Sequence, residues 1–424
     1  MESTQSWIAN VAILNKLLAK ETWYNTFFAK YSGNVDISKD DNGNPVYQPS
    51  GKPIEILNEY IAEGRDKMLI PFLRELTGSP VYGDTVLKGT GEDQSMYWLR
   101  SYVNQYRKAV MKKSGSMSEQ RQKIYKLYEK AKPQLSRWFT KWENQAIFQT
   151  FYEGVSPNLS LGTSYDGLGL ARRYHPNWYI LDGDVVTTIG TAKKFKTNPQ
   201  LDDAIGMTVD NNATCDSDIN AAALLDLRLK CMELRIPQIQ TKGGHKFWVL
   251  LVHPAQAISL QKDSQYYSAQ RSAYTGKMLD LPELSGAMGF YGGFAIFEDI
   301  VGVREWDEAG YFFGSTTSER FDPTAVTLAS GTARVYNAIV FGNSAIGKGV
   351  ASDLHFTNEI DDHKNTVEVG GALINGYNRA EFLAESDAGE VSGDAFYKNQ
   401  TAAHNADDLT AINQSSLIFS TLEG

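Results

Sequence analysis

The sequence is poor in the residues that build disulfide frameworks, metal centres and membrane anchors. It has two cysteines and six histidines in 424 residues. Cys215 and Cys231 show no partner pattern, so we expect reduced or buried thiols. No apolar run reaches the roughly 20 residues of a transmembrane helix, and the start of the chain lacks the basic leader and apolar core of a signal peptide. We therefore expect a soluble protein without a membrane partner.

Motifs that carry catalysis are also missing. "GAMGFYGG" lacks the Gly-Lys-Ser/Thr ending of a Walker loop, and there is no His-Glu-x-x-His helix, Cys-x-x-Cys pair or Gly-x-Ser-x-Gly elbow. His245 and His253 flank one predicted strand, about 26 Å apart if it is extended, which is too far to share an ion. "DNNATCDSD" lacks the glycine and glutamate of a calcium loop, so we interpret Asp216 and Asp218 as helix caps. We expect no catalytic residue, cofactor or metal site, and no enzyme.

One stretch has an unusual composition. "SMYWLRSYVNQYRKAVMKK", residues 95–113, has one tryptophan, three tyrosines, two methionines, two arginines and three lysines, but no acid. Tyr, Trp, Met and Arg are enriched, and Asp and Glu depleted, at the centres of protein–protein contacts. The stretch therefore indicates a contact surface.

The same stretch is predicted to be one arm of a long hairpin. An extended segment at 66–78 and a turn-rich link at 77–93 precede it. Residues from Trp98 to Val110 also fall on a helical stripe, so periodicity alone leaves strand and helix open, and we favour the strand. Nineteen extended residues span roughly 60 Å, whereas a compact chain of this length has a radius of gyration of about 22 Å. Such a hairpin would project from its own domain.

A long helix is expected over 116–154. It begins with the capping box "SMSE" and continues with apolar residues at helical spacing, while Pro133 should bend it near Glu129. Residues 95–143 contain twelve Lys and Arg against three Glu, a net charge of +9. Because the whole chain has a net charge of −9, the remaining residues have a net charge of −18. This basic region is either a solvated face or a surface that meets acidic patches on neighbouring copies.

The remaining sequence predicts an arm and an α+β body. Residues 4–30 have the pattern of an amphipathic helix, and the Gly-, Asn-, Asp- and Pro-rich stretch that follows predicts a flexible stalk without regular structure. Beyond 155, short strands alternate with helices. The predicted elements are strands at 177–190, 245–254 and 284–303, helices starting at Asp216 or Asp218 and after Pro254, a strand and a small-residue helix from 331, a hairpin through Asn375 and Gly376, and a closing strand "SSLIFSTL".

The order of these parts resembles bacteriophage major capsid proteins of the Hong Kong 97 fold, in the branch found in short-tailed phages including crAss-like ones. The strings "GTGEDQSMYWLRSYVNQYRKAV", "LSRWFTKWENQAIFQTFYEG", "HKFWVLLVHPAQAISLQKD" and "GGALINGYNRAEF" carry the resemblance. It covers most of residues 60–385.

The resemblance implies a set of domains. These are an N-terminal arm (1–65), an extended loop (66–115), a peripheral domain (116–214) with a spine helix (116–154), an axial α/β domain (215–350), and a peripheral return with a C-terminal strand (351–424). It also implies a structural protein that self-assembles through pentamers and hexamers into an icosahedral shell. The shell would enclose double-stranded DNA without sequence specificity, in a virion assembled in the host bacterial cytoplasm. Portal, scaffolding and decoration proteins would be further partners.

We expect the subunit interface to use the basic, aromatic region. The candidate hairpin anchors are Trp98, Arg100, Tyr102 and Tyr106, and the candidate electrostatic guides are Arg107, Lys108, Arg121 and Lys126. Two alternatives remain open: a soluble hydrolase whose residues converge only in space, and a DNA-binding module built on residues 95–143.

Overall fold

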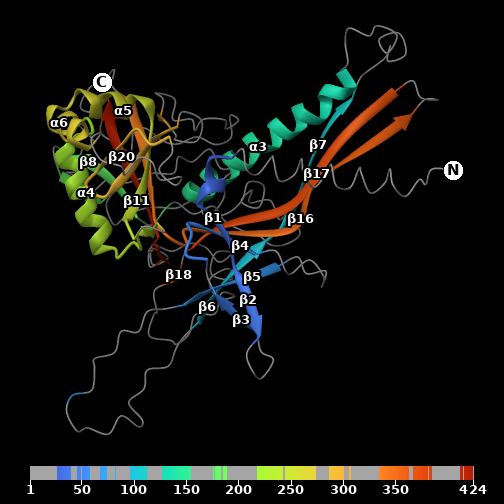
Figure 1. Ribbon diagram of the computed structural model, residues 1–424, viewed down its shortest axis with the longest axis horizontal. Helices are drawn as coiled ribbons and strands as arrows, with labels where there is room; N and C mark the ends of the chain where they lie inside the picture. Colours follow the sequence, from blue (N-terminus) through green and yellow to red (C-terminus); the bar gives the residue numbers. More distant parts are fainter. Residues whose placement is uncertain are drawn as a thin grey trace, which may run out of the picture.

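The computed structural model describes two large sheets, a long helix and a layer of shorter helices. The residues it describes are 26–39, 45–48, 50–57, 67–73, 82, 96–111, 127–153, 175, 177–182, 185–188, 217–241, 244–273, 286–299, 305–306, 334–361, 366–380, 382–383, 411–413 and 415–423. Figure 1 shows the nine-stranded sheet and its helices at one end, and the five-stranded sheet extending away from it with helix α3 alongside. The mixed α/β character agrees with the expected fold class.

The nine-stranded sheet has its strands in the order β12-β13-β11-β15-β20-β8-β9, with β10 beside β11 and β14 beside β15. Its strands are β8 (Trp178–Asp182), β9 (Val185–Thr188), β10 (Ile239–Gln240), β11 (Lys246–Val252), β12 (Gly289–Tyr291), β13 (Phe294–Glu298), β14 (Glu305–Trp306), β15 (Arg334–Phe341) and β20 (Ser416–Glu423). It therefore combines strands from three of the expected segments: 116–214, 215–350 and 351–424.

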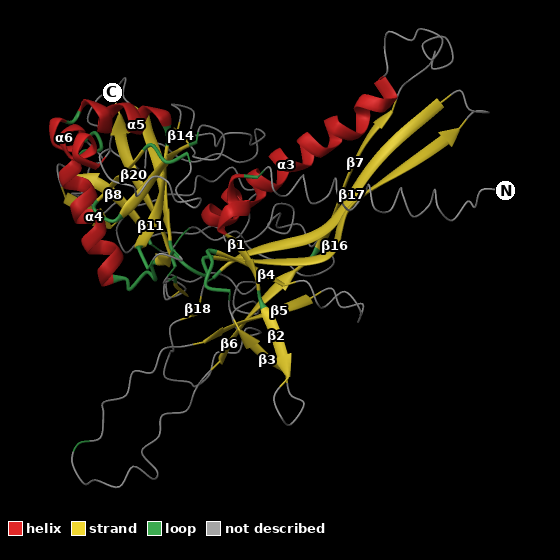
Figure 2. Ribbon diagram, viewed as in Figure 1, coloured by secondary structure: helices red, strands yellow, loops and turns green. Residues whose placement is uncertain are grey.

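Both faces of this sheet are covered. Helices α4 (Ala221–Glu233), α5 (Pro254–Lys262) and α6 (Ser264–Ala273) form a layer on one face (Figure 2). Trp248, Leu250 and Val252 of β11 point into that layer, while Phe247, Val249 and Leu251 belong to the core on the opposite face. This explains why "FWVLLV", residues 247–252, is continuously apolar: a strand buried on both faces has no polar alternation.

The five-stranded sheet has the order β1-β4-β16-β17-β7. Its strands are β1 (Ser32–Asn34), β4 (Ile54–Leu57), β7 (Asn104–Met111), β16 (Ile346–Asp361) and β17 (Thr366–Arg379). Helix α3 (Leu127–Glu153), with Pro133 inside it, lies along one face. Gly371 allows the close contact, because a Cβ there would lie 2.6 Å from the Phe139 ring.

Helix α3 connects the two halves of the molecule. Leu135 and Phe139, in its N-terminal half, pack on β7, β16 and β17. Phe148 and Phe151, in its C-terminal half, enter the core beneath the nine-stranded sheet. The prediction of a long helix is confirmed over 127–153, and residues 116–126 lie outside the described part.

The structure corrects the prediction of an unstructured N-terminal stalk. The short helix η1 (Phe27–Tyr31) is followed by β1, by the antiparallel pair β2 (Asp36–Lys39) and β3 (Pro45–Gln48), and by β4. Phe28, Tyr31 and Ile54 are at most 1% exposed and belong to the main core. Strand β4 pairs in parallel with β16, far along the chain, so part of this stretch belongs to the five-stranded sheet. The helix predicted at 4–30 lies mostly outside the described residues.

Three further predictions were wrong. The segment after β15 is strand β16, not a small-residue helix, and β17 runs straight through Asn375 and Gly376 instead of turning there. Helix α4 is capped by Asn220, whose side chain accepts a hydrogen bond from the Ala223 amide, and not by Asp216 or Asp218. The strands β11, β13 and β20 and the start of α5 at Pro254 are confirmed.

The predicted hairpin is present but shorter than expected. Strand β5 (Lys67–Leu73) pairs antiparallel with β6 (Met96–Tyr102). At Val103 the strand is interrupted, and the chain continues as β7, which pairs with β17 of the five-stranded sheet. The stretch 95–113 is therefore not one free arm, because its second half is the edge strand of a sheet. A further small pair joins β18 (Phe382–Leu383) and β19 (Ala411–Ile412).

Candidate subunit interface

The eight predicted interface residues fall in three places. Trp98, Arg100 and Tyr102 lie on β6, opposite Pro71, Leu69 and Lys67 of β5. Tyr106, Arg107 and Lys108 lie on β7, opposite Leu373, Ala372 and Gly371 of β17. Arg121 and Lys126 lie outside the described residues.

Tyr106 is an internal residue, which corrects its assignment as an exposed hairpin anchor. Its side chain is 5% exposed, and its ring centroid lies 4.1 Å from that of Trp142 on α3. Leu373 and Phe139 belong to the same cluster. An aromatic residue on an alternating strand can cover either its own helix or a partner, and the sequence does not distinguish these cases.

The next residues of β7 are exposed. Arg107, Lys108, Ala109 and Val110 all have exposed side chains, and β7 ends the order of described strands in its sheet. Lys108 lies over the Trp138 ring on α3, with 5.5 Å between its Nζ and the ring centroid. Because side chains alternate along a strand, Arg107 faces away from α3. Within the described ranges, neither basic residue has an acidic partner at salt-bridge distance.

The exposed side of α3 adds two more basic residues. Arg137 and Lys141 are exposed, and they lie four residues apart, so they occupy one face of the helix. They too lack an acidic partner among the residues that the structure describes. The basic region therefore does expose cationic side chains, but they are divided between the α3 side of the sheet and the opposite side.

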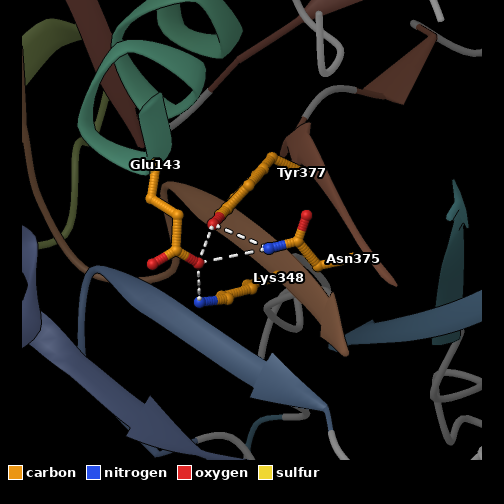
Figure 3. Close-up of polar contacts among 4 residues, drawn as sticks. All are labelled: Glu143, Lys348, Asn375 and Tyr377. Carbon is orange, nitrogen blue, oxygen red and sulfur yellow. Dashed lines mark hydrogen bonds and ion pairs between the residues drawn. The ribbon is translucent and has the colours of Figure 1, made fainter. Parts of the chain in front are cut away.

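A buried polar cluster fixes α3 to the sheet beside this surface. Glu143 Oε1 accepts hydrogen bonds from Lys348 Nζ at 3.1 Å, Asn375 Nδ2 at 3.2 Å and the Tyr377 hydroxyl at 3.1 Å (Figure 3). Asn375 Nδ2 also contacts the Tyr377 hydroxyl at 3.2 Å. The side chains of Glu143 and Lys348 are each 7% exposed. Four residues from α3, β16 and β17 therefore share one desolvated site.

Burial and charge shift the pKa values of Lys348 and Tyr377 in this cluster. Burial lowers the pKa of Lys348, and the Glu143 carboxylate opposes this shift. Burial, together with the same carboxylate, raises the pKa of Tyr377 well above its usual value. A carboxylate that accepts three hydrogen bonds compensates for part of its own desolvation. The arrangement is suited to holding helix and strands in one register, because buried side chains from α3, β16 and β17 bind the same Glu143 oxygen.

The sequence contained one signal for this cluster. Glu143 is four residues after Phe139 and three before Ala146, so it is an acid on the apolar face of a predicted helix. The sequence around Lys348 and Asn375 did not indicate a buried polar site, because these two residues come close together only when β16 pairs with β17.

One buried His–Ser pair bears on the hydrolase alternative. His175 Nε2 lies 2.8 Å from Ser416 Oγ, and His175 Nδ1 accepts a hydrogen bond from the Asn177 amide. With the proton on Nε2, the neutral ring donates to the Ser416 hydroxyl, and Asn413 Nδ2 lies 3.4 Å from the same nitrogen. Both residues are also fully buried. The pair is structural.

Cys231 and His253 have structural roles. Cys231 is a free, buried thiol on α4 whose pKa is raised by burial, as expected for a small buried hydrophobe. His253 caps α5 and stacks on Tyr336. No group of three or more His, Cys, Asp or Glu side chains in this part could hold a metal ion. No described helix is long and apolar enough to cross a membrane. Cys215 lies outside the described residues.

Comparison with known proteins gives the class of the fold first. The capsid of Ralstonia phage GP4 is similar over 94% of this chain and 91% of its own, with a TM-score of 0.61 and 16% identity. The head structure of Helicobacter pylori bacteriophage KHP40 is similar over 95% of this chain and 92% of its own, with a TM-score of 0.56 and 12% identity. The capsid asymmetric unit of cyanophage Pam1 is similar over 93% of this chain and 91% of its own, with a TM-score of 0.54 and 14% identity. The fold is that of phage capsid proteins.

The sequence then identifies the family. The profile of the family described as "Phage capsid protein" matches residues 14–396. This chain therefore belongs to the phage capsid protein family, and its role is structural. No curated protein sequence matches the chain.

Proposed function

We propose that this protein is the major capsid protein of a bacteriophage and has the Hong Kong 97 fold, in the branch found in short-tailed phages including crAss-like ones. Copies assemble through pentamers and hexamers into an icosahedral shell that encloses double-stranded DNA in the virion, without sequence-specific contacts, after assembly in the cytoplasm of the host bacterium. The observation that carries this proposal is the family match over residues 14–396. The protein has no catalytic role in this proposal. Portal, scaffolding and decoration proteins are its further partners.

The described surface supports self-assembly. The edge strand β7 exposes Arg107 and Lys108, and an edge strand with unpaired backbone groups is a ready contact for another chain. Within the described residues these cations lack acidic partners, while the rest of the chain carries an excess of acid. Charge complementarity of this kind sets register and association rate more than affinity. Trp98, Arg100 and Tyr102 on the hairpin, and Arg121 and Lys126, complete the proposed contact set.

Electron microscopy of the purified chain tests this proposal. We expect negative-stain images of the wild-type protein to show shells or separate capsomers. The double variant Arg107→Glu/Lys108→Glu should assemble more slowly, with a reduced salt dependence of the rate, while its thermal unfolding matches the wild type. A wild-type protein that stays monomeric at high concentration would contradict the proposal.

A DNA-binding measurement on the wild-type protein separates shell assembly from DNA binding by the 95–143 region. A DNA-binding module loses affinity steeply as salt increases. If the wild-type protein binds duplex DNA tightly but does not assemble, the DNA-binding alternative is favoured. If it assembles without DNA, the shell role is supported.

A further inference from the structure

The buried cluster on α3, β16 and β17 contains the three functional groups of an amide-exchange reaction. Lys348 has a primary amine, Asn375 has a carboxamide, and Glu143 has a carboxyl group. Glu143 Oε1 lies 3.1 Å from Lys348 Nζ and 3.2 Å from Asn375 Nδ2. An amine can displace ammonia from a carboxamide when a positioned carboxyl group transfers the protons. The cluster therefore has the groups for a covalent reaction as well as for an ion pair.

The pairing of β16 with β17 brings the amine and the carboxamide together. Lys348 pairs with Tyr377, and Val350 pairs with Asn375. Lys348 and Asn375 are therefore diagonal neighbours on one face of the sheet, a separation that a long side chain can span. Figure 3 shows both nitrogens facing the same Glu143 oxygen. The flexible four-carbon stem of lysine lets Nζ move from this oxygen to the neighbouring carboxamide carbon.

The site is shielded from water. The exposed fractions of Glu143, Lys348 and Asn375 are 6%, 5% and 3%. Phe139 and Ile147, one turn of α3 before and after Glu143, are fully buried. Burial lowers the pKa of Lys348, which favours the neutral amine, the form that acts as a nucleophile. A site without water also suppresses the competing hydrolysis of the carboxamide.

The two polar atoms of the Asn375 carboxamide are in different states. Its nitrogen contacts both the Glu143 carboxylate and the Tyr377 hydroxyl. Its oxygen, Oδ1, is buried and has no hydrogen-bond partner among the described residues. A buried polar atom without a partner is rare, and a catalytic role is one of its recognised causes. The nitrogen, which has to leave in the exchange, is therefore the atom that lies against the proton-carrying group.

We propose that Lys348 and Asn375 form an isopeptide bond within one chain, with Glu143 as the catalytic acid and base. Glu143 first takes one proton from the Lys348 ammonium group. As Nζ bonds to Asn375 Cγ, Glu143 gives this proton to Nδ2 and takes a second proton from Nζ. The Cγ–Nδ2 bond then breaks and ammonia leaves. The reaction needs no oxidant, reductant or other reactant.

The bond joins β16 to β17 beneath α3. A cross-link between the two strands restricts the unfolded chain and so stabilises the folded one. Because both residues belong to one chain, the bond forms with or without contacts between copies. It goes beyond the proposed function, and the failure of either one leaves the other standing.

Mass spectrometry of the full-length protein tests the proposal. The mass of the denatured wild-type chain should be lower by one ammonia molecule, both before and after assembly. Trypsin should not cut after Lys348, so residues 335–364 should be recovered joined to residues 365–379. A wild-type chain of full mass would overturn the proposal.

The peptide map also distinguishes a second way to lose ammonia. Gly376 follows Asn375, and at an Asn–Gly sequence the backbone nitrogen can attack the carboxamide and close a succinimide ring. The loss of mass is the same, but trypsin then still cuts after Lys348. Separate peptides 335–348 and 365–379, the second lighter by one ammonia, would overturn the proposal.

Three variants identify the reacting groups. Glu143→Gln keeps the size of the side chain but cannot transfer protons, and Lys348→Arg keeps the positive charge but does not lose its proton to become a nucleophile. Both should have the full mass and give no joined peptide. Lys230→Arg, in the exposed ion pair on α4, is the matched control and should react like the wild type.

The result for Glu143→Gln decides the role of the carboxyl group. If this variant forms the joined peptide as completely as the wild type, Glu143 is not catalytic and the proposed reaction is overturned. If either cluster variant fails to fold, the peptide map of the wild type still decides whether the bond exists, because that measurement uses the unaltered chain.

Discussion

The two sheets of this protein bury their apolar side chains in different ways. In the nine-stranded sheet, residues 247–252 of β11 are all buried, alternately against the helical layer and against the α3 side. In the five-stranded sheet, Leu354 and Phe356 of β16 are buried toward α3, whereas Asp353, His355 and Thr357 between and beside them are exposed. One sheet is closed on both faces, and the other is covered on one.

The difference extends to the surfaces that each half exposes. The half with the nine-stranded sheet exposes apolar side chains on its outer helices, while the five-stranded half exposes cations on β7 and α3. Apolar contacts contribute affinity, and charged contacts contribute register and rate. A capsid protein that exposes both kinds of surface at separate places can use the charged surface to orient neighbouring copies and the apolar surface to hold them.

The largest effect is expected from breaking the buried ion pair of the five-stranded half. Glu143→Leu leaves Lys348 buried without a counter-charge, and Lys348→Met leaves Glu143 in the same state, so each should cost about 3–5 kcal/mol of unfolding free energy. The double variant Glu143→Leu/Lys348→Met should recover part of this loss, because no unpaired ion remains, while Asn375 and Tyr377 still lose the Glu143 acceptor. Chemical denaturation of the wild type, the two single variants and the double variant measures the coupling free energy between Glu143 and Lys348.

A matched control for this cycle lies in the other half. Lys230 and Glu233 on α4 form an ion pair at 3.1 Å, but their side chains are 27% and 52% exposed. Lys230→Met should therefore change stability by no more than about 1 kcal/mol. An equal loss for Lys230→Met and Lys348→Met would mean that burial does not decide the strength of these pairs.

Truncation of one leucine in each half compares the two cores directly. Leu250 is fully buried in the closed sheet, and Leu354 is 7% exposed in the half-covered one. Leu→Ala substitutions in cores cost about 2–5 kcal/mol, depending on how far the site can collapse. We expect Leu250→Ala near the upper end and Leu354→Ala near the lower end, measured by thermal unfolding. The reverse order would show that the half with the open face is the more tightly packed.

Local signals predicted the elements that depend on local sequence. "KFWVLLV" before Pro254 predicted both β11 and the start of α5, since a proline fits the first turn of a helix. The spacing of Leu135, Phe139 and Ala146 predicted α3. The composition of 95–113 predicted a contact surface, and this stays a prediction; within the stretch Arg107 and Lys108 are exposed, whereas Tyr106 is buried.

Elements that depend on distant partners were not predictable in the same way. Gly347 and Gly349 in β16 weaken any local strand pattern, but pairing with β4 on one side and β17 on the other supplies the backbone hydrogen bonds. Asn375 and Gly376 have the letters of a hairpin turn. In the fold, however, Gly376 lies opposite Gly349 and the Asn375 side chain binds Glu143. The buried cluster therefore becomes visible only when α3, β16 and β17 meet.

The smallest effect is expected from pH, at the joint between the two halves. Glu55 of β4 is 2% exposed. Its carboxylate accepts hydrogen bonds from the Ser50 amide at 2.9 Å, from Ser50 Oγ at 2.6 Å and from Ser344 Oγ at 3.2 Å. Ser344 lies in the turn between β15 and β16. Burial raises the pKa of Glu55 above its usual 4.5, although these hydrogen bonds oppose the shift.

A raised pKa means that the folded chain holds this proton more tightly than the unfolded chain does. The stabilisation from the proton is complete below pH 4.5 and is lost as the pH rises through the folded pKa. The loss is roughly 1.4 kcal/mol for a tenfold difference in proton affinity between the folded and unfolded chains. Glu55→Gln keeps an acceptor oxygen but does not ionise. Its unfolding free energy relative to the wild type should therefore increase from pH 4 to pH 7 in denaturation experiments. A difference that stays constant over this range would show that the joint between the halves is insensitive to the charge of Glu55.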